Sequence, residues 1–214
     1  TTLDLFLDLL AGRNMNLSLE ENLAILRKLA HTLHVLHSNN VVHRNVSPHS
    51  VYLTINGGIR LGNFTMAKAS PAAQPITQKV AGSFKEYCME YWGGEDALFE
   101  SGQEENITKN MKCVLGTVAY MSPEQTHGVS QVDRRSDIWS WGVIAFELLE
   151  GKRPFPEESV WSTVQRIREG KISEFSREIP PALQRIVYTA LEVNLEKRYQ
   201  WANDIVKHLD LLIK

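Results

Sequence analysis

The sequence predicts a mainly helical fold with one small β-hairpin, built as a single domain over residues 1–214. Three observations lead to this fold class. Apolar residues recur three and four positions apart in several stretches, which is the spacing of a helix with one buried face. The turn sequence Asn56-Gly57-Gly58 separates two short apolar runs, as in a hairpin. Residues 69–112 show neither periodicity and read as a long inserted loop.

The composition indicates a folded globular protein, with 43% hydrophobic and 22% charged residues. A net charge of -2 argues against a nucleic-acid partner. Cys88 and Cys113 lack metal-ligand spacing, so we expect reduced thiols and an intracellular, cytoplasmic location. The apolar run Trp139–Leu149 is too short to span a membrane, and we expect no membrane among the partners of the protein. Because the chain opens with Thr1, we expect a longer natural polypeptide.

Two helices are expected before the hairpin. The first covers Leu3–Leu10 and stops at Gly12. Ser18 and Glu21 have the spacing of a capping box, which predicts a second helix that runs to Asn39. The expected strands of the hairpin are 51–55 and 59–61, and four further helices are expected at about 132–149, 157–169, 181–193 and 200–213.

Several motifs then follow one another in the order known from one family. Residues 41–53, VVHRNVSPHSVYL, resemble the catalytic loop HRDxKPxN of protein kinases, and residues 63–65 lie where that family has DFG. Residues 122–124 resemble its APE motif. Residues 137–144 resemble the central helix of its large lobe, and Arg198 falls in the motif that pairs with the APE glutamate. The resemblance is to the protein kinase superfamily, in its serine/threonine branch.

The resemblance covers the C-terminal lobe only. A glycine-rich phosphate loop and a strand lysine, which belong to the small lobe, do not occur in the sequence. The chain is therefore expected to be a kinase-like C-terminal lobe, with a degenerate catalytic loop at 41–50, a degenerate DFG at 63–65 and a long activation-segment insert at 69–112.

Each position that carries the chemistry in the family holds a different residue in this chain. Asn45 replaces the general base, whose help is typically worth about 10² to 10⁴ in rate. Ser47 replaces a phosphate-contacting lysine, and Ser50 and Asn63 replace the two metal ligands. Thr65 replaces the DFG glycine, which leaves open a locked segment or simple static packing.

Five further residues have structural roles by resemblance. His43 is a core residue, Asp137 accepts backbone N–H groups of the catalytic loop, and Glu124 forms a buried ion pair with Arg198. Arg44 allows two interpretations. It can pair with an acidic or phosphorylated residue of the insert, or it can form a static ion pair.

The insert contains an apolar pattern of its own. Phe84, Tyr87, Cys88, Tyr91 and Trp92 would share one face of a short helix. That face is expected to dock onto the domain itself or onto a protein partner.

These expectations together describe a catalytically inactive pseudokinase that serves as a scaffold or allosteric module, with a protein partner or an upstream domain of the same polypeptide. No cofactor or metal is expected, although weak metal-independent ATP binding stays open. The alternative is an atypical serine/threonine kinase whose small lobe lies upstream or on another chain, with Asp133 or Glu86 recruited to the metal.

Overall fold

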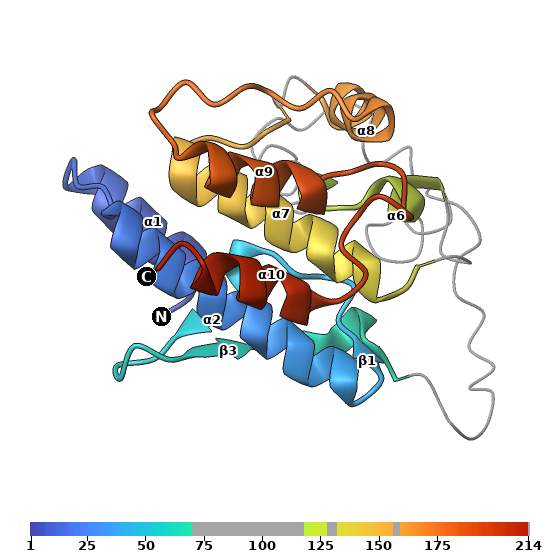
Figure 1. The fold of residues 1–214 in the computed structure, drawn as a ribbon, viewed down its shortest axis with the longest axis horizontal. Helices are drawn as coiled ribbons and strands as arrows, with labels where there is room; N and C mark the ends of the chain where they lie inside the picture. The colour runs from blue at the N-terminus through green and yellow to red at the C-terminus, as the bar shows by residue number, and fades with distance from the viewer. Residues whose placement is uncertain (70–117, 128–131, 156–158, 214) are drawn as a thin grey trace, which may run out of the picture.

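The computed structural model describes residues 1–69, 118–127, 132–155 and 159–213, which form a mostly helical fold with short β pairs at one side (Figure 1). Its helices are α1 (Leu3–Gly12), α2 (Leu19–Ser38), α6 (Pro123–His127), α7 (Arg134–Glu150), α8 (Val160–Glu169), α9 (Pro181–Ala190) and α10 (Ala202–Asp210). The strands are β1 (Val41–Val42), β2 (Val51–Leu53), β3 (Ile59–Leu61) and β4 (Lys68–Ala69), and two 3₁₀ turns cover Pro48–Ser50 and Phe64–Met66. The predicted fold class is confirmed.

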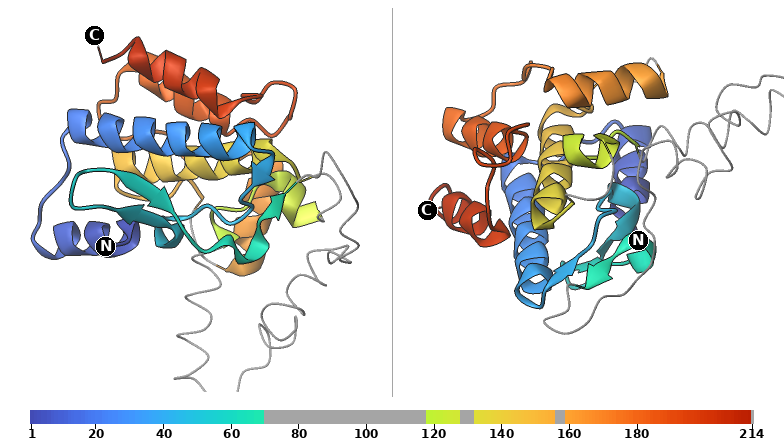
Figure 2. Two further views of the ribbon diagram at one scale, coloured as in Figure 1. Left: turned by 90° about the horizontal axis from the view of Figure 1, so that it is seen from below. Right: turned by 90° about the vertical axis from the view of Figure 1, so that its right-hand side faces the viewer.

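Helix α7 is the central element. It packs against α2 on one side and α9 on the other, as Figures 1 and 2 show from three directions. All its residues are buried except Arg134, Arg135 and Glu147. A Cβ on Gly142 would lie 2.9 Å from Leu191, so the close contact with the end of α9 needs a glycine there. The helix ends at Gly151, which has a left-handed φ of 81°.

Helix α2 follows its sequence pattern closely. The Ser18 side chain accepts a hydrogen bond from the Glu21 amide, and the Glu21 carboxylate accepts one from the Ser18 amide at 2.8 Å. This is the predicted capping box. The apolar face, which includes Leu26, Leu29 and Leu33, is buried against α7 and α10.

The predicted hairpin is present, with β2 and β3 antiparallel and Leu53 paired to Ile59. The first strand ends at Leu53 and not at the predicted residue 55. The Thr54 hydroxyl accepts a hydrogen bond from the Gly58 amide at 2.9 Å, so the turn already begins at Thr54. Gly57 has a φ of 69° in this turn.

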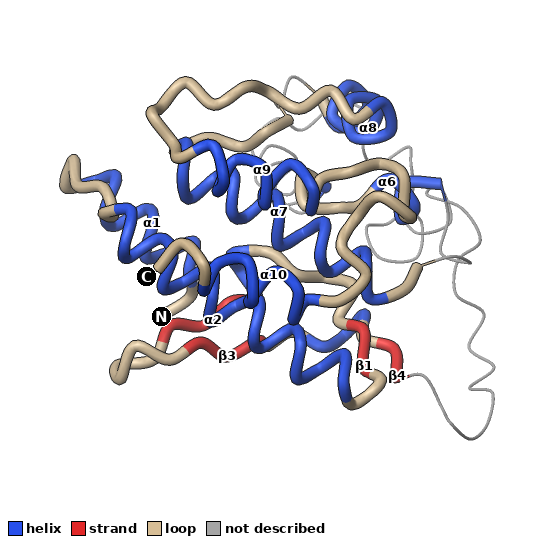
Figure 3. Tube along the Cα trace, viewed as in Figure 1, coloured by secondary structure: helices blue, strands red, loops and turns tan. Residues whose placement is uncertain are grey.

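The structure departs from the sequence expectations in several places. Strands β1 and β4 pair antiparallel (Figure 3), although two-residue strands give no periodic signal. Helix α6 was not expected. Helices α9 and α10 end three residues before their predicted limits, at Ala190 and Asp210. Within the described ranges, no helix combines the length and apolar character that a membrane crossing requires.

Most of the predicted insert lies outside the described residues. Only residue 69 of the range 69–112 is described, as the end of β4. The predicted helix with Phe84, Tyr87, Tyr91 and Trp92 therefore stays a prediction.

Candidate functional site

The loop between β1 and β2 is held by the buried carboxylate of Asp137, in the first turn of α7. One carboxylate oxygen accepts the His43 amide at 2.8 Å and the other accepts the Arg44 amide at 2.7 Å. His37 Nε2 lies 2.9 Å from the same carboxylate. Arg44 has a φ of 63°, a left-handed conformation that is rare for its residue type. The paired hydrogen bonds therefore fix a strained backbone at the start of the loop.

The His43 ring is fully buried and engaged at both nitrogens. Nε2 donates to the Gly62 carbonyl at 2.8 Å, and Nδ1 accepts from the Asn45 amide at 3.3 Å. The Phe64 ring packs on it with centroids 4.7 Å apart. This arrangement leaves no ring nitrogen for proton transfer, in line with a structural role.

Ser47 and Ser50 bond to one another within the 3₁₀ turn at Pro48–Ser50. The Ser50 hydroxyl accepts from the Ser47 amide at 3.0 Å and donates to the Ser47 carbonyl at 2.9 Å. Ser50 has no exposed surface. Its hydroxyl therefore serves the turn itself and does not face a ligand.

Asn63 lies at the other side of the site, in a left-handed conformation with φ 58° and ψ 56°. Asparagine adopts this region more readily than most residues. Thr65 Oγ1 donates to Asn63 Oδ1 at 3.0 Å. Thr65 itself lies in the 3₁₀ turn, so the positive φ falls on Asn63 and not on the position of the DFG glycine.

A kinase site would hold Mg²⁺, and the residues of this loop do not fit it. Magnesium binding usually requires at least one carboxylate beside the phosphates. Asn63 and Ser50 are uncharged, and Ser50 is enclosed. Asp133 caps α7 through the Arg135 amide at 2.8 Å and pairs with the Arg135 guanidinium at 2.9 Å, so it already has structural partners. Among the described residues, no group of three or more His, Cys, Asp or Glu side chains could hold a metal, and Glu86 lies outside them.

Arg44 connects the loop to the segment before α7. Its carbonyl accepts from Gln125 Nε2 at 2.8 Å, and its Nη2 donates to the Val132 carbonyl at 3.3 Å. Burial lowers the pKa of the guanidinium, and the charge of Asp137 opposes this shift in part. Its Nε is buried and has no hydrogen-bond partner among the described residues. The proposed pairing with the insert lies outside the described residues.

Arg198 and Glu124 form an ion pair beside the first turn of α7. Arg198 Nη1 and Nη2 lie 2.8 and 3.1 Å from the two carboxylate oxygens, and the side chains are 0% and 8% exposed. Ser136 donates to the same carboxylate at 2.6 Å. Burial alone would raise the pKa of Glu124, but the hydrogen bond and charge of Arg198, with the Ser136 bond, lower it overall.

Three side chains of this assembly were not predicted from the sequence. They are His37, Gln125 and Ser136, which bond to Asp137, the Arg44 carbonyl and Glu124. Only His37 had a signal, because it follows Leu33 by four residues on the apolar face of α2.

Comparisons with known proteins place both halves of the chain in the same group. Residues 98–209 match the family described as protein kinase domain, and residues 3–89 match protein tyrosine and serine/threonine kinase. A probable serine/threonine-protein kinase of Clostridium acetobutylicum is 30% identical over 85% of this chain and 23% of its own length.

Two further relatives give the same result. The serine/threonine-protein kinase PknB of Mycobacterium leprae is 29% identical over 87% of this chain and 25% of its own length. A probable serine/threonine-protein kinase of Streptomyces coelicolor is 32% identical over 88% of this chain and 23% of its own length. The chain thus spans about a quarter of the length of these relatives.

Proposed function

Since this chain belongs to the protein kinase superfamily as part of the C-terminal lobe, we propose that it is a catalytically inactive pseudokinase and acts as a protein-interaction scaffold or allosteric module. The proposal extends to a degenerate ATP site, with at most weak, metal-independent ATP binding. Its partner would be a protein or an upstream domain of the same polypeptide, in an intracellular, cytoplasmic setting.

The internal bonding of Ser50 carries this proposal. A metal-binding side chain at this position would have to point out of the loop with free lone pairs. The Ser50 hydroxyl is instead buried and bonded twice to the Ser47 backbone. An acid recruited to the metal from elsewhere in the protein would still leave the Ser50 hydroxyl bonded to the Ser47 backbone.

The other catalytic positions support the same interpretation. Asn45 carries a neutral amide, which cannot accept a proton at neutral pH. The carboxamide oxygen of Asn63 already accepts from Thr65. The loop backbone is nevertheless fixed by Asp137, so the region offers a rigid surface without the charges of a phosphotransfer site.

The second candidate is an atypical serine/threonine kinase that transfers phosphate from ATP. It is favoured by the names of the relatives, which describe serine/threonine-protein kinases. In this case an acid such as Glu86, outside the described residues, would hold the metal. Asp133 is a poor source because its carboxylate caps α7 and pairs with Arg135.

A radiolabelled ATP assay separates the two. The full-length protein is incubated with Mg²⁺ or Mn²⁺, a generic protein substrate and labelled ATP, beside an active bacterial serine/threonine kinase as positive control. We expect no transfer to the protein itself or to the substrate. Transfer that persists through purification and disappears in Asn45→Ala would establish the kinase instead, as would a thermal shift with ATP that requires the metal.

A further inference from the structure

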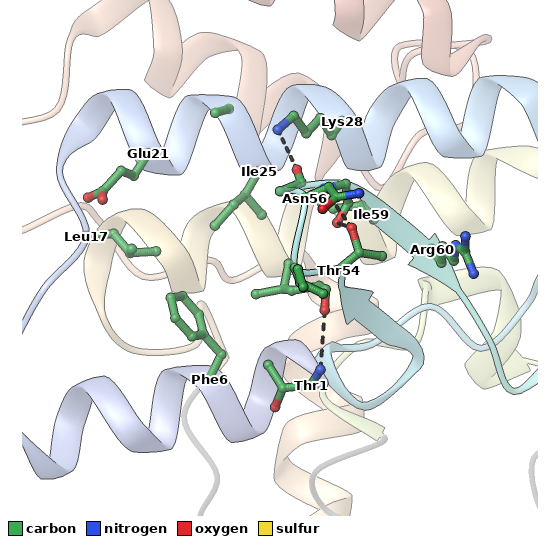
Figure 4. A pocket seen from close by; sticks show the side chains of 15 residues that line it. Thr1, Phe6, Leu17, Glu21, Ile25, Lys28, Thr54, Asn56, Ile59 and Arg60 are labelled. Atoms are coloured by element: carbon green, nitrogen blue, oxygen red, sulfur yellow. Dashed lines mark hydrogen bonds between the residues drawn. The ribbon is translucent and has the colours of Figure 1, made fainter.

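A large groove lies between α1, the first half of α2 and the tip of the hairpin, and none of residues 41–50 of the catalytic-like loop lines it. Its volume is about 900 Å³, at the upper end of the range for ligand sites. Figure 4 shows Phe6 of α1 and Ile25 of α2 directed toward one another, with Leu17 beside them and the hairpin on the other side of the groove. The apolar lining comprises Phe6, Leu17, Ile25, Leu53 and Ile59, which all pack on the core.

One rim of the groove is apolar and open to solvent. Ile55, at the tip of the hairpin, is 100% exposed. An isolated exposed apolar side chain is ordinary, but this one borders an apolar cavity and extends its surface outward. The groove is therefore suited to a ligand that brings an apolar group of its own.

The two charges on the α2 side of the groove have opposite signs. Lys28 Nζ donates to the Gly57 carbonyl at 2.5 Å. Because this carbonyl is uncharged, the bond does not neutralise the ammonium group, and it uses one of the three N–H donors. Glu21 lies seven residues earlier on the same helix, about 10 Å away at 1.5 Å per residue. Arg60 also borders the groove, but Figure 4 shows its guanidinium directed away from the cavity.

This bipolar rim selects among the possible ligands. A fatty acid would satisfy Lys28 but would leave an apolar tail beside the Glu21 carboxylate. A nucleic acid would be repelled by Glu21. An extended peptide advances about 3.3 Å per residue, so the spacing of the two helix positions along α2 corresponds to about three residues.

We propose that this groove binds an extended segment of a partner protein in which an acidic and a basic residue three positions apart contact Lys28 and Glu21, while an apolar side chain between them fills the cavity. The inference deepens the proposed scaffold role by giving the partner a chemical pattern. It does not depend on whether the domain is inactive, because phosphotransfer and peptide binding are measured separately.

The test is fluorescence anisotropy with the full chain and a labelled peptide of sequence Gly-Glu-Leu-Phe-Lys-Gly. We expect saturable binding. Peptides in which both charged residues are glutamate, or both are lysine, should bind about two- to fivefold more weakly, as should the protein variants Lys28→Gln and Glu21→Gln. Lys197→Gln, the same charge change at an exposed site outside the groove lining, is the matched control and should bind as the parent.

A cavity-blocking variant tests the site directly. Ala24 is exposed on α2 and lines the groove, so Ala24→Trp should fill the groove without removing a core contact, and should abolish binding. Ile55→Ser is a second variant that cannot disturb the core, and it should weaken binding.

Three results would overturn the proposal. They are the absence of saturable binding by the parent protein, equal binding of the three charge patterns, and unchanged binding in both Ala24→Trp and Ile55→Ser. Binding of decanoate without binding of the peptide would assign the groove to a fatty acid and would also reject it.

Discussion

The polar groups of the catalytic-like loop and those of the helical core differ in charge and in how far apart in the sequence their bonding partners lie. In the loop, the side chains at the catalytic positions are uncharged, and Ser47 and Ser50 bond to one another across three residues. In the core, the charged side chains of Glu124 and Arg198 bond across 74 residues, and the Asp137 carboxylate accepts the backbone amide of His43 across 94 residues. Long-range contacts of charged groups stabilise the fold, whereas short-range contacts between uncharged groups occur at the positions where the family has its catalytic residues.

The difference shows that the shape of the loop and its chemistry are separable. The backbone at His43 and Arg44 is fixed by Asp137, which belongs to α7 and not to the loop. The Asn45 side chain can therefore change without loss of the loop geometry, whereas the Ser50 hydroxyl holds the turn through its two bonds to the Ser47 backbone. Removing a core charge should be costly, whereas changing Asn45 should not.

The largest expected effect comes from Arg198→Ala. The change leaves the Glu124 carboxylate buried without its ionic partner, and breaking such a pair typically costs about 3 to 5 kcal/mol of unfolding free energy. Chemical denaturation of the full chain measures it. Arg27→Ala, which removes an exposed ion pair to Asp210, is the control and should give a much smaller loss. Equal losses in the two variants would refute the contrast between core and surface.

Asp137→Asn should have the next largest effect. The new amide group can accept at one oxygen only, so a buried N–H of His43 or Arg44 loses its acceptor, at a cost of about 1 to 3 kcal/mol. Asp133→Asn at the start of the same helix should cost much less, because asparagine caps a helix about as well as aspartate and the ion pair to Arg135 that is lost is partly exposed. Denaturant midpoints for both variants provide the comparison.

The ion pair should also make stability depend on pH in a predictable direction. The pKa of folded Glu124 is lowered from its ordinary value of 4.5. As the pH falls below 4.5, Glu124 binds a proton in the unfolded chain before it does so in the folded chain. The stabilisation by ionised Glu124 is therefore complete at pH values well above 4.5 and is lost as the pH falls toward the folded pKa. The stability difference between the parent and Glu124→Gln should therefore narrow from pH 5 to pH 3. A constant difference would contradict the shift.

Asn45→Ala should have the smallest effect. The catalytic position contributes its backbone amide to His43, and an alanine keeps that bond. We expect a change within about 0.5 kcal/mol, the usual range for substitutions outside the core. Thermal melts beside Arg198→Ala would show it, and a loss of several kcal/mol would mean that the Asn45 side chain supports the loop.

Much of the helical architecture could be predicted because it depends on local patterns. The Ser18 and Glu21 capping box and the apolar spacing of α2 act over one or two helical turns. The limits of α9 and α10 could not be predicted as well, because helix ends fray and are set by tertiary packing. The pairing of β1 with β4 joins segments too short to carry a pattern.

The residues of the candidate site were predicted, but the bonds made by Ser50 and Asn63 were not. The resemblance identified Asn45, Ser50 and Asn63 as altered positions. Whether Ser50 faces a ligand or its own turn depends on one rotamer, and the Thr65 bond to Asn63 depends on a left-handed backbone. The groove beside Lys28 is formed by α1, α2 and the hairpin, which meet only in the folded chain, so no local sequence pattern predicts it.

The burial of α7 on nearly every side has a consequence for hydrogen exchange. Amide hydrogens of a helix that lacks a solvent-facing side are released only when the whole domain opens, whereas those of the hairpin turn at Thr54–Gly58 can be released by local fluctuation. Asp137 joins the loop backbone to that helix. The amides of His43 and Arg44, although they belong to a loop, should therefore exchange on the slow timescale of global unfolding and report on the core.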